Sequence, residues 1–336
     1  MLVIRFVQPS KLSKFDKESK FFGVVLIFFV NYCNFVGSKR LDAHFMEEKT
    51  KMKLSPGLRI ILLFIFAFVG VLATFAVVPF LDRLPMHDAT LGVMVLQDVM
   101  VFIVPAIVVS VLLFKHPLQH MNLDRAPSWR ALLMVLLVCV VSMPALNWTI
   151  AWNGSLHLPQ FLDWLEEMLR DSEQAAQMLT DKLLSETSLP SMLVVLAVVS
   201  LLAGLSEEMF FRGGMLRMLG NDGNSHAAVW LVGIVFSAMH VQFFGFVPRM
   251  LLGVWLGYLL VWTRSLWVPV IAHALNNGIV VVSAYLVNIN VVPKDALENI
   301  GVPQEGQFPW LALASAVATV ALVCIAKKWL HRKTTK

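Results

Sequence analysis

The stretch LSEEMFFR, residues 205–212, lies at the end of an apolar run that starts near Ser191. It places two adjacent carboxylates, Glu207 and Glu208, and the guanidinium of Arg212 within sequence suited to hydrocarbon. Ionisable side chains inside a membrane segment are costly, and they mark functional sites by default. We therefore expect partners for these charges on other apolar runs of the chain.

The composition is that of a polytopic membrane protein. Of the 336 residues, 58% are hydrophobic and 15% are charged, whereas soluble domains carry about 45–50% apolar and about 25% charged residues. The net charge is +5, but the basic residues cluster at the ends of apolar runs, as cytoplasmic flanks do, so we expect no nucleic-acid partner. The three cysteines lie far apart in apolar stretches and form neither a metal motif nor a disulfide framework.

Apolar runs follow one another closely from residue 58 onward. Each is near the ~20 residues that a helix needs to cross the hydrocarbon core, and a helix satisfies its own backbone polar groups. We therefore predict an all-α fold, a polytopic membrane helical bundle of about eight transmembrane helices. The predicted spans are 58–81, 91–114, 130–152, 191–219, 227–244, 247–263, 266–289 and 308–326.

The N-terminal part does not fit this pattern. Residues 1–51 hold a short apolar run, 21–37, with basic residues on both sides. We interpret 1–51 as an N-terminal extension, signal-like or added by an upstream start, and Met52 as a natural beginning of the bundle over 52–336. We predict that 21–37 does not span the membrane stably, because a further span would place the basic N-terminus outside.

Basic residues orient the predicted bundle. The tail 327–333 is basic, so we predict a cytoplasmic C-terminus, and without a eukaryotic-type targeting pattern we expect a bacterial inner (plasma) membrane. Counting back through the spans puts most other basic helix ends on the same side, with Arg249 as the exception. The outer loop 153–190 has apolar residues at helical spacing, which predicts an amphipathic helix on the membrane surface or capping the bundle, or an ordinary packed loop helix.

The first polar cluster contains two glutamates that point in different directions. Glu208 and Arg212 are four residues apart, so they share a helix face and can pair. Glu207 points about 100° away around the same helix. We therefore predict that Glu208 is structural, and that Glu207 is available for chemistry and faces His240 across the bundle.

Two further polar clusters interrupt later apolar runs. One is His240, and the other is His273 with Asn277 one turn later on the same face. At a rise of about 1.5 Å per residue, all three clusters lie about 10–20 Å from helix ends on the same side, so they can meet at one level. A single buried histidine is more often structural, but three such clusters at matching depth favour a functional site.

These residues fit two kinds of hydrolytic chemistry. In the first, Glu207 takes a proton from water that a histidine orients, while Asn277 and a second histidine donate to the oxyanion. In the second, Glu207, His240 and His273 hold a divalent metal such as zinc, with water in the open position. The chain has neither an HExxH helix nor a recognisable serine or cysteine nucleophile motif.

The three motifs, in this order, resemble the CPBP family of intramembrane proteases. This is the CAAX-processing and bacteriocin-processing (Abi) family, which includes type II CAAX prenyl endopeptidases. The resemblance covers about residues 190–290. The residues that carry it are Glu207, Glu208 and Arg212, then Phe236 and His240, then His273 and Asn277.

The resemblance implies an endopeptidase that cleaves a membrane-associated protein or peptide in the lipid bilayer. It implies that Glu207 and His240 activate water, and that His273 and Asn277 stabilise the oxyanion. The remaining motif residues, Phe236 among them, then support the site. No cofactor follows with certainty; we favour the metal-independent glutamate mechanism over a zinc site.

A non-enzymatic membrane protein is the alternative. Intramembrane Glu, Arg and His also serve ion and proton pathways, so a bacteriocin immunity factor, a scaffold or a small transporter fits the same residues. Transporters often show paired broken helices and repeats, and the chain shows neither. A function that survives loss of Glu207 would favour this class.

Overall fold

The computed structural model describes residues 51–52, 54–81, 83–219, 226–293, 299–304 and 307–330. The run 21–37, with the prediction made for it, lies outside the described residues, as does the chain beyond Leu330. Over the described part the chain is helical and contains no β-strand.

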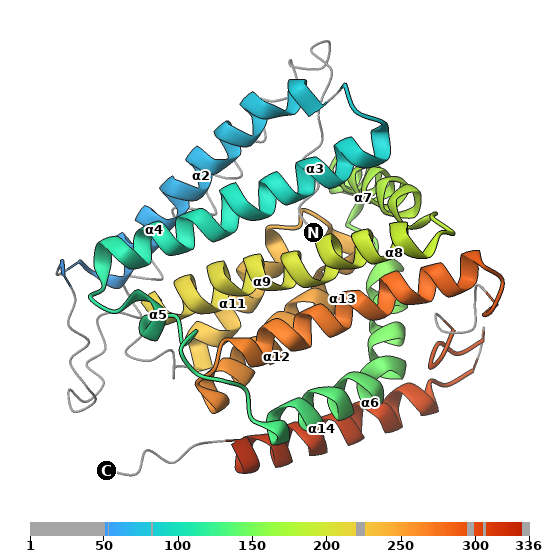
Figure 1. Cartoon of the computed structure of the whole chain (residues 1–336). Coiled ribbons are helices and arrows are strands. Elements are labelled where there is room, and N and C mark those ends of the chain that lie inside the picture. The colour runs from blue at the N-terminus through green and yellow to red at the C-terminus, as the bar shows by residue number, and fades with distance from the viewer. Residues whose placement is uncertain are drawn as a thin grey trace.

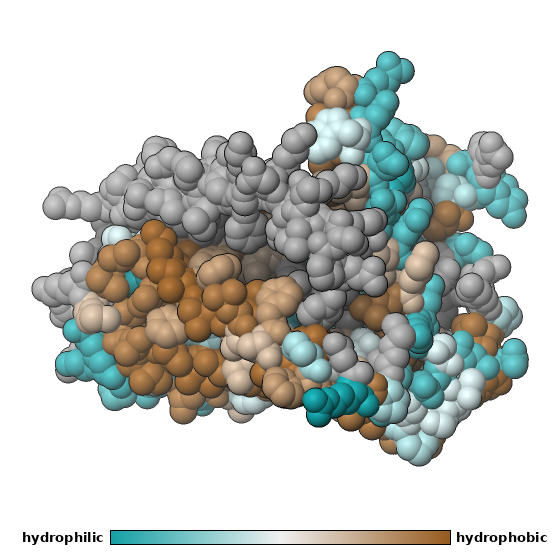
Figure 2. Space-filling model, turned by 90° about the horizontal axis from the view of Figure 1, so that it is seen from above, coloured by the Kyte–Doolittle hydropathy of each residue, from teal (hydrophilic) through white to brown (hydrophobic). Residues whose placement is uncertain are grey.

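The predicted all-α membrane bundle is confirmed. In the described residues, seven helices are long and apolar enough to cross a membrane, so the chain is an integral membrane protein. Figure 2 shows hydrophobic residues gathered on the left-hand part of this face and mainly hydrophilic residues on the right. The five uninterrupted spans are α2 (Pro56–Leu81), α6 (Trp129–Gly154), α12 (Phe246–Thr263), α13 (Trp267–Asn288) and α14 (Trp310–Leu330). A further long helix, α7 (Asp163–Leu184), is not one of the seven.

Two of the spans are composite, because π-helical turns interrupt them. Such turns are rare and occur frequently at functional sites. The span containing Asp98 has one of them, and the span containing Glu207 and Glu208 has two, one on each side of the glutamates. The segments of the first span are α3 (Met86–Gln97), η2 (Asp98–Ile103) and α4 (Val104–Leu113). Those of the second are α8 (Leu189–Val195), η4 (Leu196–Leu202), α9 (Ala203–Glu208), η5 (Met209–Leu216) and α10 (Arg217–Leu219).

The predicted span 227–244 is shorter than expected. Its helix, α11 (His226–Ala238), has 13 residues, about 20 Å, against a hydrocarbon core of about 30 Å. The chain then turns through Val241, whose φ of 54° is left-handed, into the 3-10 turn η6 (Phe243–Gly245). Two further short elements complete the described fold, α5 (Pro117–His120) and η3 (Gln160–Leu162).

Close helix contacts bring the helices of the C-terminal half together. A Cβ at Gly204 of α9 would lie 3.0 Å from the backbone nitrogen of Ala274 in α13, so glycine permits this approach. Gly253 of α12 packs in the same way against Gly233 of α11, where its Cβ would lie 3.0 Å from the Gly233 Cα. Figure 1 shows α9, α11, α12 and α13 side by side in the middle of the bundle. The three polar clusters are carried by these helices and by the turn that follows α11.

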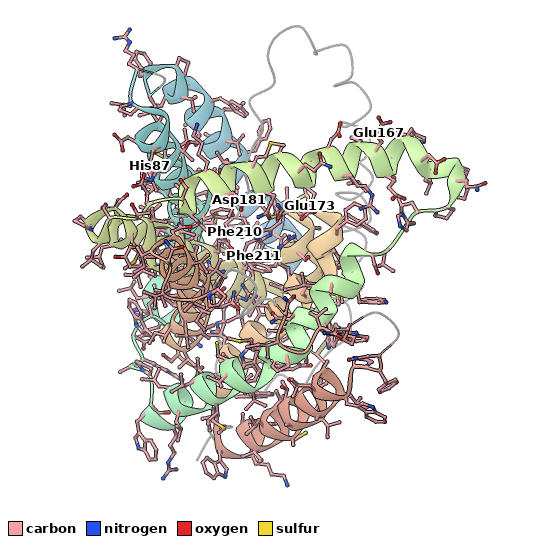
Figure 3. All side chains as sticks on the ribbon, turned by 90° about the vertical axis from the view of Figure 1, so that its right-hand side faces the viewer. His87, Glu167, Glu173, Asp181, Phe210 and Phe211 are labelled. Carbon is pink, nitrogen blue, oxygen red and sulfur yellow. The ribbon has the colours of Figure 1, made fainter. Side chains whose placement is uncertain are left out.

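The helix predicted in the loop 153–190 is α7, and it packs on the bundle. Leu183 is 2% exposed and belongs to an apolar cluster with residues of α3, α8 and α13. Figure 3 shows α7 crossing the ends of other helices, with Glu173 on the side toward the bundle and Glu167 on the outer side. The structure therefore shows α7 packed on the bundle, while its place relative to the membrane surface stays a prediction.

Candidate active site

Glu208 and Arg212 form a fully buried ion pair, as their spacing predicts. Arg212 Nη1 donates to Glu208 Oε1 at 2.6 Å, and both side chains are 0% exposed. Arg212 Nη2 also donates to the Gly253 carbonyl at 2.7 Å, which ties η5 to α12. Removing one member of a buried pair leaves an uncompensated charge and is strongly destabilising. The pair therefore holds two of the site helices in place.

His273 lies between the two glutamates. Its Nδ1 is 2.9 Å from Glu208 Oε1, and its Nε2 is 3.9 Å from Glu207 Oε2. Because Nδ1 faces a carboxylate, we assign the proton of the neutral ring to Nδ1, so that Nε2 is turned toward Glu207. Glu208 thus orients His273 while it also pairs with Arg212.

Phe236 brings the second motif against the other two. Its ring centroid is 5.0 Å from that of His240 and 5.7 Å from that of His273, and the Arg212 guanidinium lies 4.7 Å over its face. His240 Nδ1 is 2.8 Å from the Phe236 carbonyl oxygen, so we assign its proton to Nδ1 and leave Nε2 as an acceptor. Val241 follows directly, and a left-handed backbone is unusual for a β-branched residue. Such strain is commonly kept at functional sites.

Asn277 contacts the π-helical turn η4. Its Nδ2 donates to the Val199 carbonyl at 3.1 Å, and its Oδ1 accepts from Asn276 at 3.3 Å. One turn earlier, Ser200 donates to the Ala274 carbonyl at 2.6 Å, so two polar contacts join η4 to α13. Among the described residues Asn277 makes no hydrogen bond to His273, and its second amide hydrogen is the one left for a substrate.

Asp98 is a buried acid at this site that sequence reasoning missed. It begins η2, is 6% exposed, and accepts a hydrogen bond from Ser206 Oγ at 3.0 Å. It is also close enough to Glu207 for the two carboxylates to interact electrostatically. The available signal was a single acidic residue inside the apolar run 91–114, which marks a functional position by default.

The three sequence motifs therefore meet in one cluster. Glu207 is 3% exposed and approaches His273, and His240 reaches the same cluster through Phe236. That Glu207 faces His240 and activates water with it stays a prediction. The residue pairs in contact are Glu208–Arg212, Glu208–His273, Glu207–His273, Phe236–His240 and Phe236–His273.

The described side chains do not add support to the zinc alternative, which stays a prediction. No group of three His, Cys, Asp or Glu among them is arranged to hold a metal ion. The mechanism proposed for the site uses protein groups and water alone.

The fold and this cluster define a polytopic membrane protein with a buried glutamate–histidine centre. Residues 189–279 match a family model described as type II CAAX prenyl endopeptidase Rce1-like. The matched residues hold all three motifs, so the predicted resemblance to the CAAX protease family is confirmed. No curated protein and no solved structure matches the chain.

Proposed function

We propose that the protein is an intramembrane endopeptidase that hydrolyses a peptide bond of a membrane-associated protein or peptide. The observation that carries the proposal is one cluster of contacts. His273 approaches Glu207, and the ring of Phe236 contacts both His273 and His240. This cluster lies in the part of the chain that matches the endopeptidase family. The family match supports peptidase activity in general. The chemistry of the side chains supports the mechanism.

The proposed mechanism begins with a water bound beside Glu207. A water can hydrogen-bond at about 2.8 Å to both Glu207 Oε2 and a histidine nitrogen, and we assign that nitrogen to Nε2 of His240. Glu207 accepts a proton as the water oxygen bonds to the peptide carbonyl carbon. The carbon–nitrogen bond then breaks, and Glu207 returns the proton to the leaving nitrogen. Each proton is accounted for without a covalent enzyme intermediate.

His273 and Asn277 are proposed to stabilise the oxyanion. Asn277 has one amide hydrogen beyond the one bound to Val199, and it can donate that hydrogen. His273 donates when Nε2 carries a proton, and Glu208 then accepts from the opposite nitrogen. A carboxylate orients a histidine in the same way in hydrolytic triads. Preorganised donors of this kind usually contribute the largest single term in acyl transfer.

Cleavage of a membrane-anchored peptide by purified protein in liposomes tests the proposal. Glu207→Gln keeps the side-chain size and removes the base, so we expect a folded protein whose turnover falls about 10²–10⁴-fold. Glu167→Gln, on the outer side of α7, is the matched control and should cleave like the wild type. Undiminished cleavage by Glu207→Gln would remove Glu207 from the mechanism.

One observation favours the non-enzymatic alternative. Asp98 and Glu207 are buried acids on neighbouring membrane segments, as in ion and proton pathways. Proton flux into liposomes that depends on both acids, in a preparation that cleaves no membrane peptide, would support a transporter over the endopeptidase.

We further propose that the C-terminus is cytoplasmic in a bacterial inner membrane. Lys327 and Lys328 lie in the last turn of α14, and Figure 1 shows this end and α7 at opposite ends of the bundle. A single cysteine placed at residue 334, in a chain without its own cysteines, should react with an impermeant maleimide only after the inner membrane is opened. Labelling in intact spheroplasts would reverse the orientation.

A further inference from the structure

Arg249 is the basic residue that breaks the charge bias of the bundle, and it lies beside the candidate active site. It is in the first turn of α12, after the turn η6 that follows His240. The guanidinium packs over Gly245, where a Cβ would overlap Nη2. Arg249 is thus held at the edge of the site by backbone shape rather than by an acidic partner.

The charges around Arg249 belong to the site on one side and to α7 on the other. The guanidinium is close enough to interact electrostatically with Glu207, with His240 and with Glu173 of α7. Arg249 Nη1 donates to the Gln242 carbonyl at 3.1 Å, and among the described residues no ion pair within 4.0 Å involves the guanidinium. A guanidinium has five N–H donors, so most of its capacity is left for a ligand.

Glu173 does not fill the role of a paired counter-ion. Burial raises the pKa of Glu173 despite the neighbouring Arg249 and a hydrogen bond from the Phe244 N–H, so its neutral form is favoured relative to a free glutamate. Its Oε2 is buried and has no hydrogen-bond partner among the described residues. The charge of Arg249 is therefore only partly balanced from this side.

The backbone that carries Arg249 is fixed by helices outside the family match. Asn153 of α6 is 1% exposed and bridges the turn, donating to the Phe243 carbonyl at 3.2 Å and accepting from the Val247 N–H at 2.8 Å. Arg170 of α7 lies 4.0 Å over the ring of Phe244. A site that is rigid before binding loses less entropy when the ligand arrives.

We propose that Arg249 is an anion subsite that binds a carboxylate of the peptide substrate next to the scissile bond. The inference rests on the proposed endopeptidase function and names the substrate chemistry that this site selects. Arginine suits the role, because its planar fork matches a carboxylate with two parallel hydrogen bonds. It also offsets the repulsion that Glu207 would exert on an anionic peptide. The carboxylate is either the C-terminus of the peptide or an Asp or Glu side chain after the cleaved bond.

Two pairs of N-myristoylated peptides distinguish these sources. One pair ends in a carboxylate or in an amide, and the other carries Asp or Asn after the scissile bond. In one of the two pairs the carboxylate is the group that binds Arg249. For the carboxylate peptide of that pair, we expect Arg249→Gln to raise KM about 10–100-fold, the range that hydrogen bonds to charged groups support. The neutral member should be unaffected, and kcat should stay within about twofold in both.

Gly245→Ala is the matched variant, because it keeps the charge of Arg249 but displaces the guanidinium. Gly245 has φ −118°, which alanine adopts without strain, and the atom displaced is the end of a flexible side chain. We expect the same selective rise in KM, smaller than for Arg249→Gln, with unchanged thermal unfolding. An equal loss on carboxylate and neutral peptides in both variants would show a structural role and overturn the subsite.

Binding separates this inference from the proposed function. The Glu207→Gln protein should bind the carboxylate peptide about 10–100-fold more tightly than its neutral partner, and Arg249→Gln in that background should abolish the preference. Such a binding preference, with no cleavage of either peptide by the wild type, would retain the subsite and reject the endopeptidase. Cleavage with no preference in either peptide pair would retain the endopeptidase and reject the subsite.

Discussion

The protein contains the same four-residue Glu–Arg spacing in two surroundings. Glu208 and Arg212 are 0% exposed in the middle of a membrane span, whereas Glu166 and Arg170 lie in α7 at 13% and 35% exposure. Nitrogen–oxygen distances are similar, 2.6 Å and 2.8 Å. The difference is in what surrounds the pairs, because water screens and solvates charges that hydrocarbon does not. Identical spacing in the sequence therefore predicts the pair but not its energetic weight.

The comparison is tested most strongly by removing each glutamate. Glu208→Ala leaves Arg212 buried and His273 without its acceptor, so we expect a loss of stability of about 3–5 kcal/mol, the range for breaking a buried pair. Glu166→Ala should cost a small fraction of this. Thermal unfolding of the two purified variants, followed by tryptophan fluorescence in one detergent, measures both. Equal losses in the two variants would show that burial does not set the weight of this pair.

Asp98 sharpens the comparison, because a hydroxyl rather than an arginine is its partner. Ser206 is 0% exposed and donates to Asp98 Oδ1 and to the Ala203 carbonyl. Ser206→Ala should therefore lower stability by about 1–3 kcal/mol, the cost of leaving a buried group without its partner, and by less than Glu208→Ala. Adding Asp98→Asn removes the buried charge and should recover part of the loss. A double-mutant cycle with additive losses would show that Ser206 and Asp98 do not interact.

Sequence reasoning succeeded where a local rule fixes geometry. Helix periodicity places Glu208 and Arg212 on one face, and the structure pairs them. It failed where the cause is distant in sequence. The early end of α11 is followed by a turn that Asn153 holds from 90 residues away, and hydropathy carries no trace of that contact. The apolarity of a whole run likewise hid Asp98, whose partner Ser206 lies 108 residues later.

The roles within the site show the same limit. Spacing separated Glu207 from Glu208, but the contact of both with His273 depends on the approach of α9 to α13 at Gly204. The turn that carries Arg249 is fixed by α6 and α7, which lie outside the residues matched to the family. Family motifs therefore locate the centre, while the remaining helices shape what surrounds it.

The smallest expected effect is the pH dependence of the α7 pair. The Leu158 N–H, His157 and Arg170 lower the pKa of Glu166 from 4.5 to about 2. Because the folded pKa is depressed, its stabilisation is complete above about pH 4.5 and is lost as the pH falls toward 2. The wild type should thus lose slightly more stability than Glu166→Gln between pH 5 and about pH 3, where other carboxylates titrate in both proteins. If the stabilities of the two proteins fall in parallel over this pH range, the α7 pair contributes nothing. A difference in stability that is confined to this range would be assigned to Glu166.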